Sequence, residues 1–484
     1  MEPASPREPF VLALDIGTSS ARTALYDVEG NAVPGTLASS KHRPETTPDG
    51  GSELDPDALV ERVCELLDRT LGASQGVTIA AVGTCTFWHS LVGVGADGSA
   101  TTPIYTWADT RSAGSIERLG WLLDLSELYE RTGCPPHPSF VPEKLLWLRE
   151  SQPEVFRRTR RWMSPGEYVH LRLLGETRCA HAMASATGLY DQARQTWYEP
   201  VLKAVGVEPG ELSRLAPVSQ PAGTLTREYA ARWPALSEVP WYPAVGDGAA
   251  SNLGSGAAEP GVAALNFGTS GAIRTVVPEP VRFPRGLWLY RLDEHRLLLG
   301  GALSNAGNVY SWLLRTLGLT TEEAEETLWS SRPGTTGLRF VPHLAGERSP
   351  EWRPEATGAV YGLRLDTSRQ ELLQAGMEGV LLDFLTVHNM LVTAAGELTS
   401  LVASGGAISQ SAAMRQALTN ALGRPLQVCL EEEPSARGAA LLALESLHAI
   451  PSVTDVRTDK TPPHQPDPER HQAYMALQAK VRTG

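Results

Sequence analysis

Two stretches of the chain repeat a short pattern of glycine and hydroxyl residues that is suited to binding phosphate. The first is LDIGTSSART at residues 14–23, and the second is LNFGTSGAIRT at residues 265–275. Each Gly-Thr-Ser stretch follows one short apolar run and precedes another, so we expect two strands joined by a tight turn in both places. Such a turn presents consecutive backbone N–H groups, which can hold an anion. The two related turns therefore predict a site for a polyphosphate.

The two copies differ at a position that matters for metal binding. The first copy has the carboxylate of Asp15, where the second has Asn266. Mg2+ prefers oxygen ligands and keeps several waters, so one carboxylate can anchor it. We therefore expect the first half to hold a metal and the second half mainly phosphate. An Asx-turn is the structural alternative for Asp15, and an ordinary β-turn is the alternative for each Gly-Thr-Ser stretch.

A second carboxylate, Asp247, lies between Gly246 and Gly248. Glycines on both sides allow backbone and substrate to approach closely. A carboxylate placed in this way can take the proton of an attacking hydroxyl group. The same arrangement is common in plain loops, so the motif alone leaves both interpretations open.

The length, composition and net charge of the chain indicate how many domains it has and which partners are excluded. The chain has 484 residues, of which 42% are hydrophobic, and its formal net charge is −13. This length allows two or three domains with ample cores. Acidic and basic residues are interspersed, so there is no basic field for nucleic acid or a membrane surface. Without a signal-like segment or an apolar run of roughly 20 residues, we expect a cytoplasmic protein.

The cysteines do not form a recognisable metal or disulfide pattern. There are five, and they are widely scattered without the close pairs of a zinc site. We expect free, buried thiols.

Hydrophobic periodicity favours an α/β fold, because strands alternate with amphipathic helices. Asp55 and Asp57 flank a proline and either can cap a helix, and a strand is expected over 78–85. Later helices are expected over 308–317, 368–395, 411–422 and 436–448, the last of them closing the second domain.

Five elements in one order resemble the FGGY family of carbohydrate kinases. They are Asp15 in the first turn, Gly-Asp-Gly at 246–248, the second turn at 268–271, Gly-Glu-Arg at 346–348 and Gly-Gly-Ala at 405–407. Each motif alone is of weak to moderate specificity, whereas their order and spacing are specific, and the resemblance covers about residues 10–449. It implies an α/β fold of two actin-like (ribonuclease-H-like) ATPase domains with a cleft between them.

The resemblance also implies a domain plan. An N-terminal kinase domain with a sugar-binding insertion is expected over 1–257. A C-terminal domain that binds nucleotide is expected over 258–450, and a tail with one short helix over 451–484.

The resemblance implies ATP-dependent phosphoryl transfer to a carbohydrate hydroxyl, with ATP and Mg2+ as cofactors. Asp247 matches the family's catalytic base, and Asp15 and Asp247 are the expected metal ligands. The residues expected to bind nucleotide are Thr18, Ser19, Arg22, Gly268, Thr269, Ser270, Gly307, Gly405, Gly406 and Gln410. A surface charge is the alternative for Arg22, and a strand-to-helix turn is the alternative for Gly405 and Gly406.

The acceptor is expected to bind the first domain. The motifs FWHS at 87–90, TWADTR at 106–111 and TGCPPHPSF at 132–140 look most similar to the gluconate kinases of the family. The expected acceptor-binding residues are Trp88, His89, Trp107, Asp109, Arg111, His137 and Asp247. Trp88 replaces the usual methionine, and Ser304 and Ala306 also depart from the pattern. These changes put the substrate in doubt.

A gluconate pocket needs hydroxyl acceptors and a cation or several N–H donors. Arg111, Lys144, His89 and His137 are the candidates to meet the carboxylate. Each has a structural alternative: Arg111 pairs with Asp109, Lys144 covers the adjacent helix, and the histidines are ordinary buried residues.

The expected reaction is therefore the phosphorylation of gluconate to 6-phosphogluconate, with a small-molecule sugar or sugar acid as partner and a homodimer left open. Within the family, xylulose kinase is the alternative, because the Trp-x-Asp-x-Arg pattern also occurs there. An actin-like ATPase without a small-molecule acceptor and a non-enzymatic sugar sensor are alternatives of other classes. Asp247 between its glycines argues against the ATPase, and the presence of both metal and base carboxylates argues against the sensor.

Overall fold

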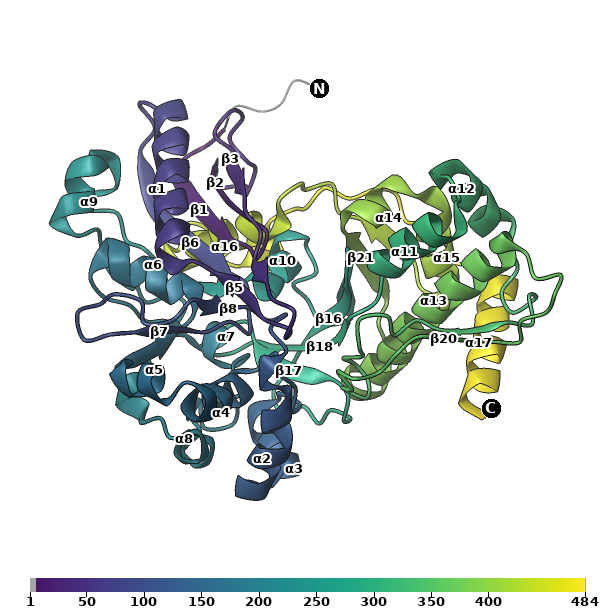
Figure 1. Ribbon diagram of the computed structural model, residues 1–484. Coiled ribbons are helices and arrows are strands. Elements are labelled where there is room, and N and C mark those ends of the chain that lie inside the picture. The colour runs from purple at the N-terminus through teal and green to yellow at the C-terminus, as the bar shows by residue number, and fades with distance from the viewer. Residues whose placement is uncertain (1–5, 484) are drawn as a thin grey trace. The chain divides into compact units, whose positions relative to one another are not determined.

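In the computed structural model, which describes residues 6–483, the first Gly-Thr-Ser stretch connects two antiparallel strands (Figure 1). These are β1 (Phe10–Ile16) and β2 (Ser20–Tyr26), and all but one of their residues are buried. The Gly17 N–H donates to the Ser20 carbonyl oxygen at 2.9 Å and closes the turn. A near-continuous apolar run of this kind is typical of a strand covered on both faces.

The second copy forms the same kind of hairpin, as predicted. Its strands are β15 (Val262–Phe267) and β16 (Gly271–Val277), which pair antiparallel. The Gly268 N–H donates to the Ser270 carbonyl oxygen at 3.0 Å.

The two hairpins differ in register, which the sequence repeat conceals. In the first, Asp15 is opposite Arg22, with four residues between the last paired positions. In the second, Asn266 is opposite Ala272, and the loop is one residue shorter. Arg274 consequently pairs with Ala264 and not with Asn266. Arg22, which pairs with Asp15 in the first hairpin, thus has no counterpart opposite Asn266 in the second.

The chain folds into two units, and segments of the two units alternate along the sequence. The first unit contains the chain up to Gly256 together with Leu289–Leu297 and Glu433–Arg457. The second contains Ala257–Trp288, Leu298–Glu432 and the chain from Thr458 onward.

A five-stranded sheet is the centre of the first unit, in the order β14-β6-β1-β2-β3. The remaining strands are β3 (Ala38–Lys41), β6 (Ile79–Thr86) and β14 (Val245–Gly246). β6 is parallel to both β1 and β14, so the carboxyl ends of these three strands lie at one edge of the sheet. Helix α1 (Pro56–Ala73) packs on β2 and β3, and the Asp55 side chain caps it as predicted.

Helix α16 (Pro434–Ser446) packs in the first unit against β1, β6 and α10 (Asp247–Gly254). The sequence led us to expect that this helix closes the second domain, whereas its contacts group it with the first unit. Glycines explain the packing, because a Cβ on Gly438 would overlap the Ala250 carbonyl oxygen and a Cβ on Gly83 would overlap that of Ala439. The backbone of α16 can approach α10 and β6 closely because of these glycines. The sequence of the helix alone does not predict these partners.

The rest of the first unit consists of short elements. Its other helices are α2 (Ser115–Leu122), α3 (Leu125–Thr132), α4 (Val141–Ser151), α5 (Pro153–Arg158), α6 (Pro165–Leu174), α7 (His181–Ala184), α8 (Glu199–Val205) and α9 (Arg227–Arg232). Its small strands are β4 (Glu45–Thr46), β5 (Ser52–Leu54), β7 (Val92–Val94), β8 (Ile104–Tyr105), β9 (Arg161–Met163), β10 (Cys179–Ala180), β11 (Tyr190–Asp191), β12 (Thr196–Trp197) and β13 (Leu215–Ala216).

The second sheet has the order β17-β18-β16-β15-β21-β22. Its further strands are β17 (Trp288–Arg291), β18 (Leu297–Leu303), β21 (Ser400–Ser404) and β22 (Leu426–Val428). The helices of the second unit are α11 (Gly307–Leu317), α12 (Thr321–Ser330), α13 (Arg369–Ala395), α14 (Gly406–Gln410), α15 (Ala412–Leu422) and α17 (Pro468–Thr483), and β19 (Arg339–Val341) pairs with β20 (Ala359–Tyr361).

The C-terminal segment is integrated into the second unit. α17 is 16 residues long and packs against α15. The His464 N–H donates to the Leu426 carbonyl oxygen at 2.8 Å, and the His471 ring lies 3.0 Å from the Asn420 carbonyl oxygen. The helix is thus longer than the short one expected, because these contacts hold it in place.

Two expectations from composition can be compared with the structure. All five cysteines are free and buried, as predicted. Among the helices of residues 6–483, none combines the length and the apolar character needed to span a membrane.

His170 on α6 predicts a pH dependence of stability. Its side chain is fully buried 3.1 Å from the Thr84 hydroxyl, and burial lowers its pKa to about 4. In the unfolded chain the group titrates near its ordinary value, so below about pH 6.5 the unfolded state binds more protons than the folded state. Lowering the pH from 7.5 to 5.5 should therefore reduce the free energy of unfolding by about 1.4 kcal/mol through His170.

Urea unfolding of wild type and His170→Asn at the two pH values measures this contribution. The variant should be less pH-dependent than wild type by that amount. Equal pH dependence in the two proteins would contradict the buried, neutral state of His170.

Candidate active site

Asp15 lies at the end of β1 in the first unit and is 4% exposed. Its Oδ1 accepts a hydrogen bond from the Cys85 thiol at 3.3 Å, and its Oδ2 lies 3.3 Å from an Arg22 nitrogen. Burial raises the pKa of this carboxyl, and the neighbouring Arg22 and Cys85 only partly oppose the shift. A buried carboxylate whose charge is incompletely balanced is suited to receive a cation.

Asp247 is the first residue of α10, directly after the short strand β14. Its Oδ1 accepts a hydrogen bond from the Gly248 N–H at 2.7 Å, within the first turn of the helix. A carboxylate at a helix N-terminus is stabilised in its charged form by the helix dipole. Because β14 pairs with β6 beside β1, Asp247, directly after β14, and Asp15, near the end of β1, lie at the same sheet edge.

The Cys85 thiol is influenced by both carboxylates. Its thiol pKa is raised well above the ordinary value, first by burial and then by the charges of Asp15 and Asp247. Both carboxylates therefore act on the same buried atom.

The donors fit Mg2+ in type. No group of three or more His, Cys, Asp or Glu side chains in the described part of the chain is arranged to hold a metal. Mg2+ does not need such a group, because it is usually bound by one or two carboxylates together with waters and substrate phosphates. Asp15 and Asp247 supply that number.

The first turn brings its expected phosphate-binding residues together. Arg22 is fixed from two sides, since its Nε lies 2.7 Å from a Glu433 oxygen and its Nη1 faces Asp15. The Thr18 hydroxyl accepts a hydrogen bond from the Trp107 indole at 3.1 Å, and Ser19 is exposed. Arg22 is therefore not a solvent-exposed surface charge.

The expected acceptor residues Trp88 and His89 lie in an aromatic cluster of the first unit. Trp88 is 6% exposed and His89 is half-buried. The His89 Nε2 lies 2.9 Å from the hydroxyl of Tyr290, and its ring packs edge-on against Phe140.

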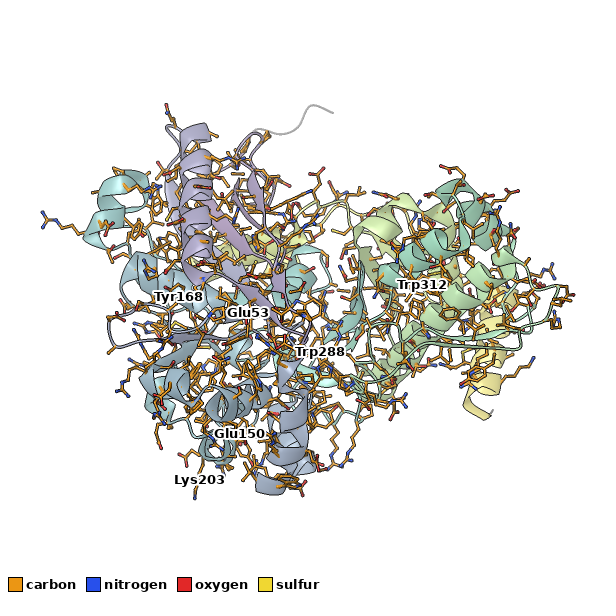
Figure 2. All side chains as sticks on the ribbon, in the orientation of Figure 1. Glu53, Glu150, Tyr168, Lys203, Trp288 and Trp312 are labelled. Carbon is orange, nitrogen blue, oxygen red and sulfur yellow. The ribbon has the colours of Figure 1, made fainter. Side chains whose placement is uncertain are left out.

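Asp109 and Arg111 are paired with each other, which was the structural alternative for Arg111. Asp109 is 1% exposed and lies 2.5 Å from an Arg111 nitrogen, and the same nitrogen lies 2.5 Å from a Glu53 oxygen. Glu53 is labelled in Figure 2. The Ser52 N–H also donates to Asp109, and the guanidinium stacks over the Trp147 ring.

His137 and Lys144 hold the loop before α4. The His137 ring lies 2.9 Å from the Ser139 hydroxyl, which donates to the Trp107 carbonyl oxygen. Lys144 is 1% exposed and donates to the carbonyl oxygens of Pro138 and Ser139. Its ammonium group thus serves the backbone of this loop, and burial lowers its pKa to about 7.

Four of the expected nucleotide residues of the second unit line a pocket of about 700 Å³. Gly268, Thr269, Gly307 and Gly406 line it. The Gly307 N–H at the start of α11 donates to the Gly268 carbonyl oxygen, and a Cβ on Gly307 would come within 2.6 Å of that oxygen. The helix N-terminus and the phosphate turn are therefore held against each other.

Gly405 is required by its backbone conformation. Its φ is +113°, and a Cβ there would lie 2.6 Å from the Phe267 carbonyl oxygen. Gln410 ends α14 and is exposed, and neither it nor the half-buried Ser270 is among the residues lining the pocket.

Sequence reasoning missed several residues that line this pocket. Asn308, Ser311, Trp312 and Arg315 lie on one face of α11, with Trp312 labelled in Figure 2. Ser311, Trp312 and Arg315 follow Asn308 by three, four and seven residues, a helical spacing that was a usable signal. Cys85, Glu433 and Tyr290 were also missed, because each is distant in sequence from the residue that it contacts.

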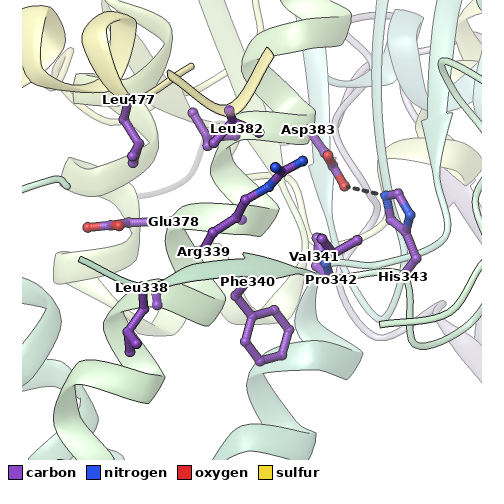
Figure 3. Close-up of a pocket in the computed structure, with 13 residues that line it drawn as sticks. Leu338, Arg339, Phe340, Val341, Pro342, His343, Glu378, Leu382, Asp383 and Leu477 are labelled. Carbon is purple, nitrogen blue, oxygen red and sulfur yellow. Dashed lines mark ion pairs between the residues drawn. The ribbon is translucent and has the colours of Figure 1, made fainter. Parts of the chain in front are cut away.

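The Gly-Glu-Arg motif lies near a second, smaller pocket of about 130 Å³ in the same unit (Figure 3). His343 lies 3.6 Å from Asp383 on α13 and 3.8 Å from Glu347 of the motif. Glu347 also pairs with Arg353 at 2.6 Å. The motif is thereby tied to α13 by a cluster of charges.

Comparison with known proteins places this geometry in a family. The N-terminal domain model of the FGGY family of carbohydrate kinases matches residues 10–254, and the C-terminal domain model matches residues 263–447. The chain is 29% identical to a gluconokinase of Bacillus subtilis (strain 168) over 97% of this chain and 94% of that protein. It is 30% identical to a xylulose kinase of Streptomyces rubiginosus over 90% of this chain and 87% of that protein.

A solved structure gives the same result for the fold. The crystal structure of a gluconate kinase from Lactobacillus acidophilus superimposes with a TM-score of 0.92 at 27% identity, covering 98% of this chain and 97% of that one. The expected two-domain α/β kinase fold is confirmed. The chain belongs to the FGGY family of carbohydrate kinases, ATP-dependent phosphotransferases that use a sugar hydroxyl as acceptor.

Proposed function

We propose that the chain phosphorylates D-gluconate with MgATP to give 6-phosphogluconate. The proposal is supported by similarity to a gluconokinase along 97% of the chain and by the acceptor motifs at 87–90, 106–111 and 132–140. The observation that carries the chemistry is Asp247 at the start of α10, directly after β14, which is separated from the Asp15 strand β1 by β6 alone.

In the proposed mechanism, Asp247 accepts the proton of the acceptor hydroxyl as the phosphoryl group is transferred. Asp15, with Asp247, would hold Mg2+, which when bound neutralises phosphate charge. Arg22 adds positive charge to the same region of the first unit. In the second unit, the backbone of residues 268–270 and the N-terminus of α11 would bind the nucleotide phosphates.

For the acceptor, we propose that His89 meets the carboxylate, whereas Asp109, which is 1% exposed and held by Arg111 and the Ser52 N–H, acts by fixing Arg111. His89 is half-buried and therefore retains an accessible side, in contrast to Lys144.

One observation favours xylulose as a second candidate. Arg111 is paired with both Asp109 and Glu53, and Lys144 donates to two backbone carbonyl oxygens. Both expected cations are thus engaged by the protein, an arrangement that suits an uncharged ketose.

A coupled assay of ADP release over gluconate, xylulose, ribulose and glycerol tests the proposal. We expect kcat/KM for gluconate to exceed that for each uncharged acceptor by at least about tenfold, since a site with donors for a carboxylate discriminates against molecules that lack one. Mass spectrometry should detect the phosphorylated acid.

Turnover with xylulose alone would overturn gluconate and favour the second candidate. ATP hydrolysis that is indifferent to every acceptor would instead contradict the proposed roles of the acceptor residues.

A further inference from the structure

A nine-residue segment from the second half of the sequence belongs to the first unit. It is Leu289–Leu297, whereas the residues on both sides of it belong to the second unit. Four hydrogen bonds tie its start to the first unit: Leu289 N–H to Gly133, Gln192 to the Leu289 carbonyl oxygen, Arg291 N–H to the Ser185 hydroxyl, and the Arg291 side chain to the Gln192 carbonyl oxygen. The segment is therefore fixed in place on both sides of Tyr290.

Tyr290 contacts two neighbouring residues of the FWHS motif, Trp88 and His89. It is fully buried, and its hydroxyl oxygen lies 2.9 Å from the His89 Nε2. Its ring packs edge-on against Trp88, with centroids 5.1 Å apart at 67°. One side chain thus orients two of the expected acceptor residues.

His89 is held in an unfavourable backbone conformation. Its φ is +58°, which a residue other than glycine seldom adopts. Strained positions of this kind persist only where neighbours over-determine them, and they gather at functional sites. The neighbours here are the Tyr290 hydroxyl and the Phe140 ring, whose centroid lies 4.9 Å from that of His89.

The same cluster reaches the expected base. A Cβ on Gly246 would overlap the Trp88 indole nitrogen, so the indole packs directly on the backbone that precedes Asp247. Tyr290, Trp88 and Gly246 therefore form one continuous packed path to the start of α10.

We infer that Tyr290 is a positioning residue for acceptor binding, which fixes the ring orientation and tautomer of His89 and supports Trp88 against Gly246. A neutral imidazole has one N–H and one lone pair, so the direction of the bond at Nε2 decides what the ring offers elsewhere. The inference rests on one part of the proposed function, namely that His89 contacts the acceptor.

The test compares Tyr290→Phe with a matched control, Tyr190→Phe. Tyr190 is also fully buried, and its hydroxyl lies 2.8 Å from the His181 Nδ1 with the rings edge-on. With the acceptor that wild type turns over fastest among gluconate, xylulose, ribulose and glycerol, we expect Tyr290→Phe to raise the acceptor KM roughly three- to tenfold. The KM for ATP and kcat should change less than about twofold, and Tyr190→Phe should change none of the three.

A double-mutant cycle with His89→Gln separates positioning from general loss of structure. If Tyr290 acts through His89, Tyr290→Phe should add little to the acceptor KM in the His89→Gln background. Histidine-selective 15N NMR should also show a changed tautomer signal in Tyr290→Phe.

The outcomes are distinguishable. An unchanged acceptor KM in Tyr290→Phe, or additive effects in the cycle, would overturn the inference while the kinase activity stands. A wild type that prefers an acceptor other than gluconate would instead overturn the gluconate proposal, and the cycle would then be measured with that acceptor. If Tyr290→Phe fails to fold while Tyr190→Phe folds, His89→Gln alone decides, and an unchanged acceptor KM in it overturns the inference.

Discussion

Replacing Asp247 with asparagine is expected to lower kcat by roughly 10²- to 10⁴-fold, the range that a positioned general base contributes. The amide keeps the shape of the side chain and can still accept from the Gly248 N–H, so the start of α10 should be retained. Because the amide cannot take up the proton of the acceptor hydroxyl, the loss should fall on the chemical step. The Kd for ATP, measured calorimetrically without acceptor, should change less than about threefold.

Asp55→Asn is the matched control for this substitution. Asp55 also stands at the start of a helix, where its side chain accepts from backbone N–H groups of α1. Asparagine caps helices about as well as aspartate, so this variant should keep kcat within about twofold of wild type. An Asp247→Asn enzyme with near-normal kcat would remove Asp247 from the role of base.

Replacing Gly438 with alanine is expected to destabilise the protein by about 3 kcal/mol. The added Cβ would overlap the carbonyl oxygen of Ala250, a backbone atom in α10 that cannot rotate away. The helices must separate, which weakens the packing of α16 on β1 and β6. Urea denaturation followed by circular dichroism measures the loss of unfolding free energy.

Gly72→Ala is the control of opposite sign. Gly72 lies inside α1 and a Cβ there meets nothing within 4 Å. Alanine is favoured over glycine in a helix interior by about 1 kcal/mol, so the same chemical change should stabilise the protein. A neutral Gly438→Ala would show that α10 and α16 are not packed backbone to backbone.

Local features of the fold were predictable, and features set by distant contacts were not. The hairpins at 10–26 and 262–277 follow from apolar runs around Gly-Thr-Ser, which act within a few residues. The one-residue difference between their loops depends on strand register, which the matching letters do not encode. The packing partner of α16 depends on Gly438 in the helix and on Gly83 and Gly254 in two other segments, so the pattern of the helix alone does not predict it.

The candidate site divides in the same way. Asp15 and Asp247 stand out because each is a carboxylate close to glycine at the end of an apolar run. Their contacts with Cys85 and Arg22, and that of Arg22 with Glu433, come from chain segments far apart in sequence. The pairing of Arg111 with Asp109 was foreseen as an alternative because the two are only two residues apart. The functional roles of all these residues stay predictions.

The first unit is built from three separate segments of the chain, which has a consequence for its synthesis. Helix α16 covers β1 and β6, yet it is translated only after most of the second unit. Until the ribosome has passed Arg457, the nascent first unit exposes the glycine-lined surface around Gly83 and Gly254 that α16 later covers. Such long-range closure is slow and leaves apolar surface open to aggregation. A ribosome stall or truncation before residue 433 should therefore release a first unit that needs chaperone protection, however complete its own sheet.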